Sequence, residues 1–99
     1  MLEMLTAESF EPLVGTDFAV SVGALDEVLT LVDVARGKRA TTDDHRYPFI
    51  LVFHGARADI CFRPQILALR HSTLGTIEID VAPFNRLPAG NYAYQAGFN

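Results

Sequence analysis

The stretch Tyr47–Gly55, Tyr-Pro-Phe-Ile-Leu-Val-Phe-His-Gly, constrains the fold of this chain most strongly. Pro48 and Gly55 bracket a run of consecutive β-forming residues. Side chains alternate between the two faces of a strand. One face would carry Phe49, Leu51 and Phe53, and the other Ile50, Val52 and His54. Apolar residues on both faces predict a central strand that is buried on both sides, or buried on one side and covered by a loop or neighbour on the other.

Further strand-like segments follow at short spacing. The predicted strands are Asp17–Val22, Leu25–Ala35, Gln65–His71, Thr76–Val81 and Asn91–Phe98, with Ile60–Arg63 as a possible edge. A short connection at Gly23 predicts a hairpin between the first two, and the mixed faces of the second predict a bulge or a long twisted strand. Pro83–Gly90 is predicted to be a loop because it contains two prolines. The sequence therefore predicts one all-β domain over residues 1–99, a mostly antiparallel β-sandwich or partly open β-barrel of six to seven strands.

The first fifteen residues favour a short helix. Thr6 or Ser9 can cap it, and Pro12 fits best within the first turn, where a missing N–H has no partner in any case. This favours Ser9 as the N-cap of a helix over Phe10–Val14 that Gly15 ends. Residues 1–15 would then form an apolar plug against the β domain of residues 16–99. The apolar side chains of the plug would be Leu5, Phe10, Leu13 and Val14.

Charge and cysteine content exclude several classes of protein. The formal net charge is −4, which argues against nucleic-acid binding, because a binding surface needs basic residues to neutralise phosphates. The basic cluster Arg36–Arg39 is followed closely by Asp43 and Asp44 and is typical of a solvated loop. Arg36–Arg46 as a whole is expected to be flexible. The single cysteine, Cys61, excludes an internal disulfide and is predicted to be a small buried hydrophobe.

The sequence gives an expectation for the cellular compartment. The beginning, Met1–Leu5, has an acidic residue where a signal peptide would be basic. No apolar run approaches the ~20 residues that a membrane-spanning helix needs. We therefore expect a cytoplasmic protein without membrane insertion, which could later join an exported or extracellular assembly.

The residues that could carry chemistry do not form a known motif. His45, His54 and His71 lack the close spacing of metal sites and are predicted to be structural, with His71 bonding the backbone of the turn that follows it. Two of them end strands, so convergence at one rim, and with it a metal-dependent enzyme, stays a weaker alternative. Glu78 and Asp80 are predicted to face solvent, and no nucleophile, phosphate or dinucleotide motif occurs. We predict no enzyme, no cofactor, and no catalytic, cofactor-binding or metal-binding residues.

The last predicted strand suggests an interaction. Tyr92, Tyr94 and Phe98 share one face and either complete the core or lie at a subunit contact. No Lys or Pro protects this strand, which would recruit partner strands if it lay at an edge. The chain is 49% hydrophobic with a mean hydropathy of +0.19, which is apolar for so small a domain and hints at an interface.

Several motifs together resemble a known family. They are Phe10–Phe18 (Phe-Glu-Pro-Leu-Val-Gly-Thr-Asp-Phe) after Thr6, Pro48–Gly55, Leu69–Gly75 (Leu-Arg-His-Ser-Thr-Leu-Gly), Pro83 and Tyr94–Asn99 (Tyr-Gln-Ala-Gly-Phe-Asn). This pattern is similar to a family of short bacterial domains of unknown function that accompany phage-tail-collar and fibre-like proteins. The chain departs from the family at Phe62–Ile66, where the family has a Pro-Leu-Pro-Gln-Gly turn. The resemblance implies no catalytic residues.

Together these observations favour a non-enzymatic structural or interaction domain. It would self-associate as a homo-oligomer, or dock as a protein partner on a larger phage-tail-like or fibre-like assembly. The alternative is a small-ligand or glycan-binding β module that uses the Arg36–Arg46 and Pro83–Gly90 loops.

Overall fold

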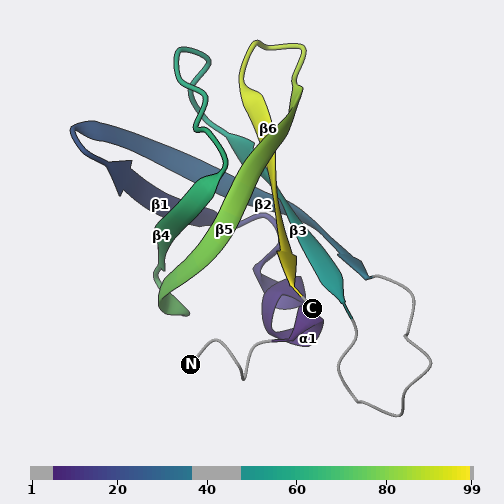
Figure 1. Cartoon of the computed structure of the whole chain (residues 1–99). Coiled ribbons are helices and arrows are strands. Elements are labelled where there is room, and N and C mark those ends of the chain that lie inside the picture. Colours follow the sequence, from purple (N-terminus) through teal and green to yellow (C-terminus); the bar gives the residue numbers. More distant parts are fainter. Residues whose placement is uncertain (1–5, 37–47, 99) are drawn as a thin grey trace.

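A computed structural model of the chain describes residues 6–36 and 48–98. Six antiparallel strands close into a barrel in the order β1-β2-β3-β6-β5-β4 (Figure 1). The strands are β1 (Asp17–Val22), β2 (Leu25–Arg36), β3 (Phe49–Gly55), β4 (Gln65–His71), β5 (Gly75–Arg86) and β6 (Tyr92–Phe98). They follow a short helix, α1 (Ala7–Phe10), and a 3₁₀ turn, η2 (Glu11–Leu13). The predicted all-β class and antiparallel arrangement are confirmed, and the barrel is closed.

β3 has one buried face. Phe49, Leu51 and Phe53 are buried, whereas Ile50 on the other face is 41% exposed and Val52 is half-buried. The prediction that both faces of this strand are covered was therefore wrong. A strand in a small barrel faces the core on one side only, and the apolar Ile50 is left on the outer surface.

The two long strands bend where their register shifts. In β2 the shift lies between Leu31 and Asp33, as the mixed faces predicted. In β5 it lies between Pro83 and Asn85, and the strand continues to Arg86. The prediction of a loop from Pro83 was wrong, because a bulge accommodates a proline that would break a regular ladder. β5 pairs with β4 from Gly75 to Val81 and with β6 from Ala82 to Arg86, so its partner changes just before the bend.

The last strand is not an edge over its first half. β6 pairs with β3 on one side, and its residues Tyr92–Gln95 pair with β5 on the other, so the condition under which we expected this strand to recruit partner strands is not met there. Closure of the barrel supplies both neighbours, which the sequence of β6 alone cannot show. Tyr94 is fully buried, and Phe98 packs partly buried against the core. The interior positions of this strand therefore complete the core.

The N-terminal helix begins earlier than predicted. Thr6 is the N-cap of α1, and Ser9 lies at its third position, where its Oγ accepts a hydrogen bond of 3.1 Å from the Thr6 N–H. The predicted helix over Phe10–Val14 with Ser9 as its cap was therefore wrong. Pro12 has no N–H for an α-helical bond, so the α-turn ends at Phe10 and continues as η2. Gly15, with a φ of +91°, lies just beyond it.

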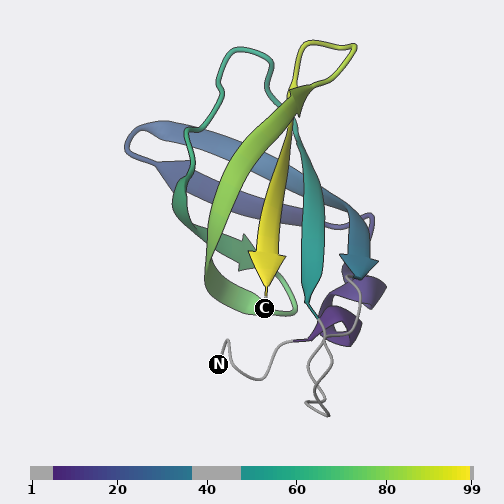
Figure 2. The same ribbon diagram turned by 45° about the vertical axis from the view of Figure 1, so that its right-hand side comes forward.

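Figure 2 shows the helical segment at one end of the barrel, and aromatic contacts hold it there. The ring of the fully buried Phe10 lies 5.9 Å from that of Phe49 and 5.6 Å from that of Phe98. On the outside, Arg36 binds Glu11 at 2.8 Å and Glu8 at 3.2 Å. Of the other predicted plug residues, Leu13 is partly buried against the core and Val14 is 43% exposed, while Leu5 lies outside the described residues.

The described part of the chain contains no helix with the length and apolarity needed to cross a bilayer. The segment predicted to be flexible, Arg36–Arg46, lies outside the described residues except for Arg36.

Candidate functional site

The histidines are not gathered at one place. His45 lies outside the described residues. His54 lies near the end of β3 and His71 ends β4, and Figure 1 shows these strand ends at opposite ends of the barrel. Over residues 6–36 and 48–98, no group of three or more His, Cys, Asp or Glu side chains is placed to hold a metal ion. The alternative of a metal-dependent enzyme at converging histidines has no support in this arrangement.

His71 has a structural role. Its Nδ1 accepts hydrogen bonds from the N–H groups of Thr73 (3.0 Å) and Leu74 (3.2 Å), as predicted for the turn that follows. Its Nε2 lies 2.9 Å from Thr16 Oγ1, and that hydroxyl donates to Leu13 O at 2.6 Å. The hydroxyl proton of Thr16 is thus used in the bond to Leu13 O, so the Nε2–H group of His71 is the donor to Thr16 Oγ1. The imidazole is buried and fully bonded, which leaves it no free nitrogen for chemistry.

A buried carboxylate holds the turn after β3. Glu27 is 3% exposed, and its oxygens accept hydrogen bonds from the backbone N–H groups of Val28 (2.8 Å), Ala56 (3.2 Å) and Arg57 (3.1 Å). Asn91 Nδ2 ties the same turn to the β5–β6 connection by donating to Gly55 O at 2.7 Å. A carboxylate bonded to several backbone donors stabilises the turn to which those donors belong.

The segment before β4 is irregular. The prediction of a strand over Ile60–Arg63 was wrong, because these residues form no strand. Phe62 is buried and its N–H donates to Tyr94 Oη at 3.1 Å, whereas Cys61 is exposed. The prediction that Cys61 is a buried hydrophobe was therefore also wrong, since Phe62 takes the core position. Burial raises the pKa of Tyr94, because the phenolate is poorly solvated there; the Phe62 N–H offsets part of this effect.

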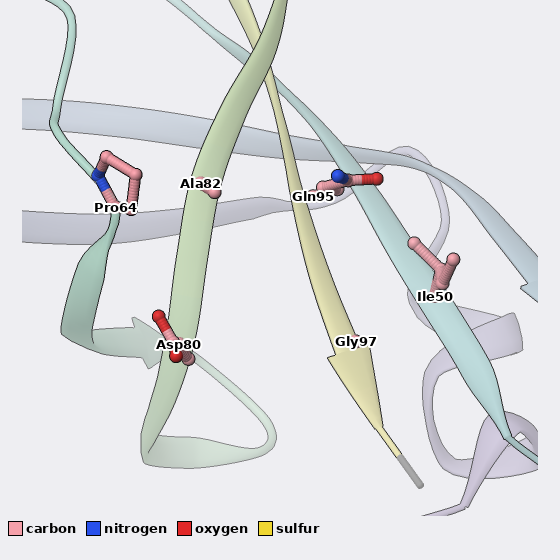
Figure 3. Close-up of a pocket in the computed structure, with 6 residues that line it drawn as sticks. All are labelled: Ile50, Pro64, Asp80, Ala82, Gln95 and Gly97. Atoms are coloured by element: carbon pink, nitrogen blue, oxygen red, sulfur yellow. The ribbon is translucent and has the colours of Figure 1, made fainter.

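The outer surface of the barrel carries a hollow of about 370 Å³. It spans β3, β5, β6 and the residue just before β4, and Figure 3 shows the residues that line it. They are Ile50, Pro64, Asp80, Ala82, Gln95 and Gly97. We call this hollow the outer groove.

Strand pairing and side-chain size explain the outer groove. Gly97 lies opposite Ile50, and Gln95 lies opposite Ala82, in neighbouring strands. A Cβ atom added at Gly97 would meet nothing within 4 Å, so the missing side chain leaves open space. Ala82 adds little bulk beside it. The hollow lies where the pairing of β5 with β6 ends at Ala82↔Gln95, and the small side chains of Ala82 and Gly97 do not fill it.

The chemistry of the outer groove favours contact over catalysis. Its walls are mainly aliphatic, and Asp80 and Gln95 supply one carboxylate and one amide. Ile66, which lies opposite Asp80 on β4, is 69% exposed, and Phe84 at the bulge of β5 is 50% exposed. Ile50, Ile66 and Phe84 therefore leave apolar side chains on three strands that line or flank the outer groove. Exposed apolar surface of this kind is typical of interaction sites.

Sequence reasoning missed the outer groove. It treated Asp80 as a solubility residue and gave no role to Gln95, Ala82 or Gly97. Ile50 was the only signal, an apolar side chain on the second face of β3. The remaining lining residues come together through pairing between strands that are distant in sequence.

Comparison with known proteins identifies a family. Neither the curated proteins nor the solved structures contain a match to this chain. One family model matches residues 5–98, which is nearly the whole chain. The chain therefore belongs to the family described as Domain of unknown function (DUF6916).

Proposed function

We propose that this chain is a non-enzymatic interaction domain that binds protein through the outer groove and the apolar side chains beside it. It would self-associate, or dock on a larger phage-tail-like or fibre-like assembly. The observation that carries the proposal is the exposed aliphatic hollow between Ile50, Gly97 and Ala82 on the outside of a closed barrel.

The packing of the barrel supports an external site. Large side chains fill the interior, and Phe18, Phe53, Leu69 and Tyr94 are among those fully buried. The polar groups most suited to chemistry, Glu27 and His71, are bonded to backbone and to Thr16. A partner therefore meets the outside of the barrel, where an aliphatic side chain removed from water contributes about 1.5–3 kcal/mol.

The link to a tail-like or fibre-like assembly comes from the sequence motifs. They resemble domains that accompany phage-tail-collar and fibre-like proteins. A domain with an apolar outer surface suits that role.

A glycan-binding or small-ligand module is the second candidate. Asp80 and Gln95 in the outer groove are the observation that favours it, because carboxylates and amides bind hydroxyl groups. This candidate requires a monomer that binds the ligand with Asp80 and loses binding in Asp80→Asn.

The proposal is tested with the substitutions Ile50→Asp and Val14→Asp. Both residues are apolar and similarly exposed, at 41% and 43%, but Val14 follows η2 and does not line the outer groove. Light scattering over a dilution series and negative-stain images would follow self-association. Any partner that co-purifies would be identified and the complex rebuilt from purified components.

We expect Ile50→Asp to lower the associated mass or release the purified partner at least tenfold more readily, and Val14→Asp to behave as the natural chain. Equal behaviour of the two variants would contradict a role for the outer groove. A monomer without a partner that binds glycans through Asp80 would replace the proposal by the second candidate.

A further inference from the structure

The barrel closes weakly between β1 and β4. The register there contains only the pairs Ala19↔Arg70 and Val20↔Leu69, whereas β4 is paired with β5 from Gln65 to His71. Residues 65–68 of β4 therefore have a strand on one side only.

The open side of β4 is suited to accept a strand. Its sequence, Gln65-Ile66-Leu67-Ala68, contains no charged residue. Ile66 lies at its centre and, at 69%, is the most exposed large hydrophobic side chain of the described residues. Uncharged, apolar edges recruit further strands, because their backbone N–H and C=O groups lack partners.

The alternation of inward and outward side chains restricts how this edge could pair with the same edge of a second copy. In an antiparallel pair of identical strands, a residue that points outward must lie opposite an outward residue of the other copy. This is possible only if the two-fold axis passes through a residue of the strand and not between two residues. An axis at Leu67 would place Leu69 opposite Gln65, but Leu69 is already paired with Val20. An axis at Ile66 uses residues 64–68 alone and places Ile66 opposite its own copy.

We infer that the partner of the open β4 edge is a second copy of this chain, joined antiparallel about a two-fold axis at Ile66. This inference rests on the proposed interaction function and names one partner for it. No charged side chain lies between Pro64 and Leu69, so the two-fold contact brings no like charges directly opposite each other. Pro64 falls at the end of the paired stretch, where a proline is tolerated.

The small size of the contact sets its strength. A single short strand from each copy belongs to the class of weak and transient interfaces, which bury less than about 1,200 Å². The dimer should therefore form in a concentration-dependent way, and a covalent trap is a suitable test.

The trap is disulfide formation by Ile66→Cys in a Cys61→Ser background, with Ala68→Cys as the matched control. Cys61 is exposed, so its replacement removes the competing native thiol. Ile66 and Ala68 are both exposed, lie on the same strand and share the outer face. Opposite partners have Cβ atoms ~5 Å apart, within reach of a disulfide. The two copies of position 68 would be offset by about 14 Å along the strands, which no disulfide spans.

We expect mild oxidation to convert Ile66→Cys to a covalent dimer at least tenfold faster than Ala68→Cys. Equal rates, or faster cross-linking of Ala68→Cys, would overturn the two-fold pairing at Ile66. Ile50→Cys in the same background separates the two proposals. If it alone cross-links, self-association occurs through the outer groove, so this inference fails and the proposed function stands. If none cross-links and the Ile50→Asp and Val14→Asp chains also behave alike, both fail.

Discussion

At the scale of single residues, the packing at the end of the barrel near Gly55 depends on side chains that lie very close to the glycine backbone. Gly55 lies between the Glu27 carboxylate and the Tyr94 ring, and both of those side chains hold backbone N–H groups of neighbouring loops. Gly97, in contrast, faces the open outer groove. Two glycines in adjacent strands thus have opposite reasons for lacking a side chain.

The substitutions Gly55→Ala and Gly97→Ala should have opposite consequences. A Cβ at Gly55 would lie 3.0 Å from Glu27 Oε2 and 3.1 Å from Tyr94 Cε2, and we expect about 1–3 kcal/mol of lost stability from overpacking. A Cβ at Gly97 meets nothing, and we expect a change within about 1 kcal/mol, in the stabilising direction. Urea unfolding of both variants measures this. Equal losses would contradict the described surroundings of the two residues.

Tyr94 should make stability depend on alkaline pH. Its pKa is raised in the folded state by burial, so the unfolded chain loses this proton first as the pH rises. The contribution is constant below the ordinary tyrosine pKa of about 10 and is lost above it. Unfolding free energies between about pH 8 and 11 should therefore fall less steeply in Tyr94→Phe than in the natural chain. An identical slope in the two proteins would show that Tyr94 ionises as freely folded as unfolded.

At the scale of elements, His71 connects the β4–β5 hairpin to the segment between η2 and β1. Its two ring nitrogens bond Thr73 and Leu74 on one side and Thr16 on the other. Its ring also lies 4.6 Å from that of Phe18 in β1. The hairpin and the N-terminal segment are therefore stabilised by one side chain.

Replacing His71 should separate its two roles. In His71→Asn, a side-chain oxygen can still accept bonds from the turn, because Asn makes such contacts two residues along the backbone. In His71→Ala the partly buried N–H groups of Thr73 and Leu74 lose their acceptor, and we expect a loss of about 0.5–1.5 kcal/mol for each hydrogen bond. In thermal unfolding, the melting temperature should be highest for the natural chain, lower for His71→Asn and lowest for His71→Ala. An asparagine variant no better than alanine would mean that the turn contacts contribute nothing.

The elements themselves could largely be predicted from sequence, because alternation in β1, β4 and the first half of β5 is a local property. The predictions were wrong where a contact with a residue distant in sequence determines the local structure. Pro83 stays within β5 because pairing with β6 provides a bulge there. Cys61 is exposed because its neighbour Phe62 reaches Tyr94.

At the scale of the whole molecule, closure of the barrel changes which surfaces are free. The sequence left an open edge at the last strand as one alternative, but β6 has neighbours on both sides over Tyr92–Gln95. A side without a strand neighbour lies at the start of β4, and the outer groove requires the registers of β3, β5 and β6 together. Neither feature could be predicted from a single segment, because each depends on which distant strands become neighbours.

The most direct test of the account is the mass of the natural chain in solution, measured by light scattering over a dilution series. Self-association through the outside of the barrel predicts a mass above the 10.9 kDa of one chain that falls toward that value on dilution. It also predicts that Ile50→Asp or a charge at Ile66 shifts the transition to higher concentration. A mass of 10.9 kDa at every concentration would contradict self-association.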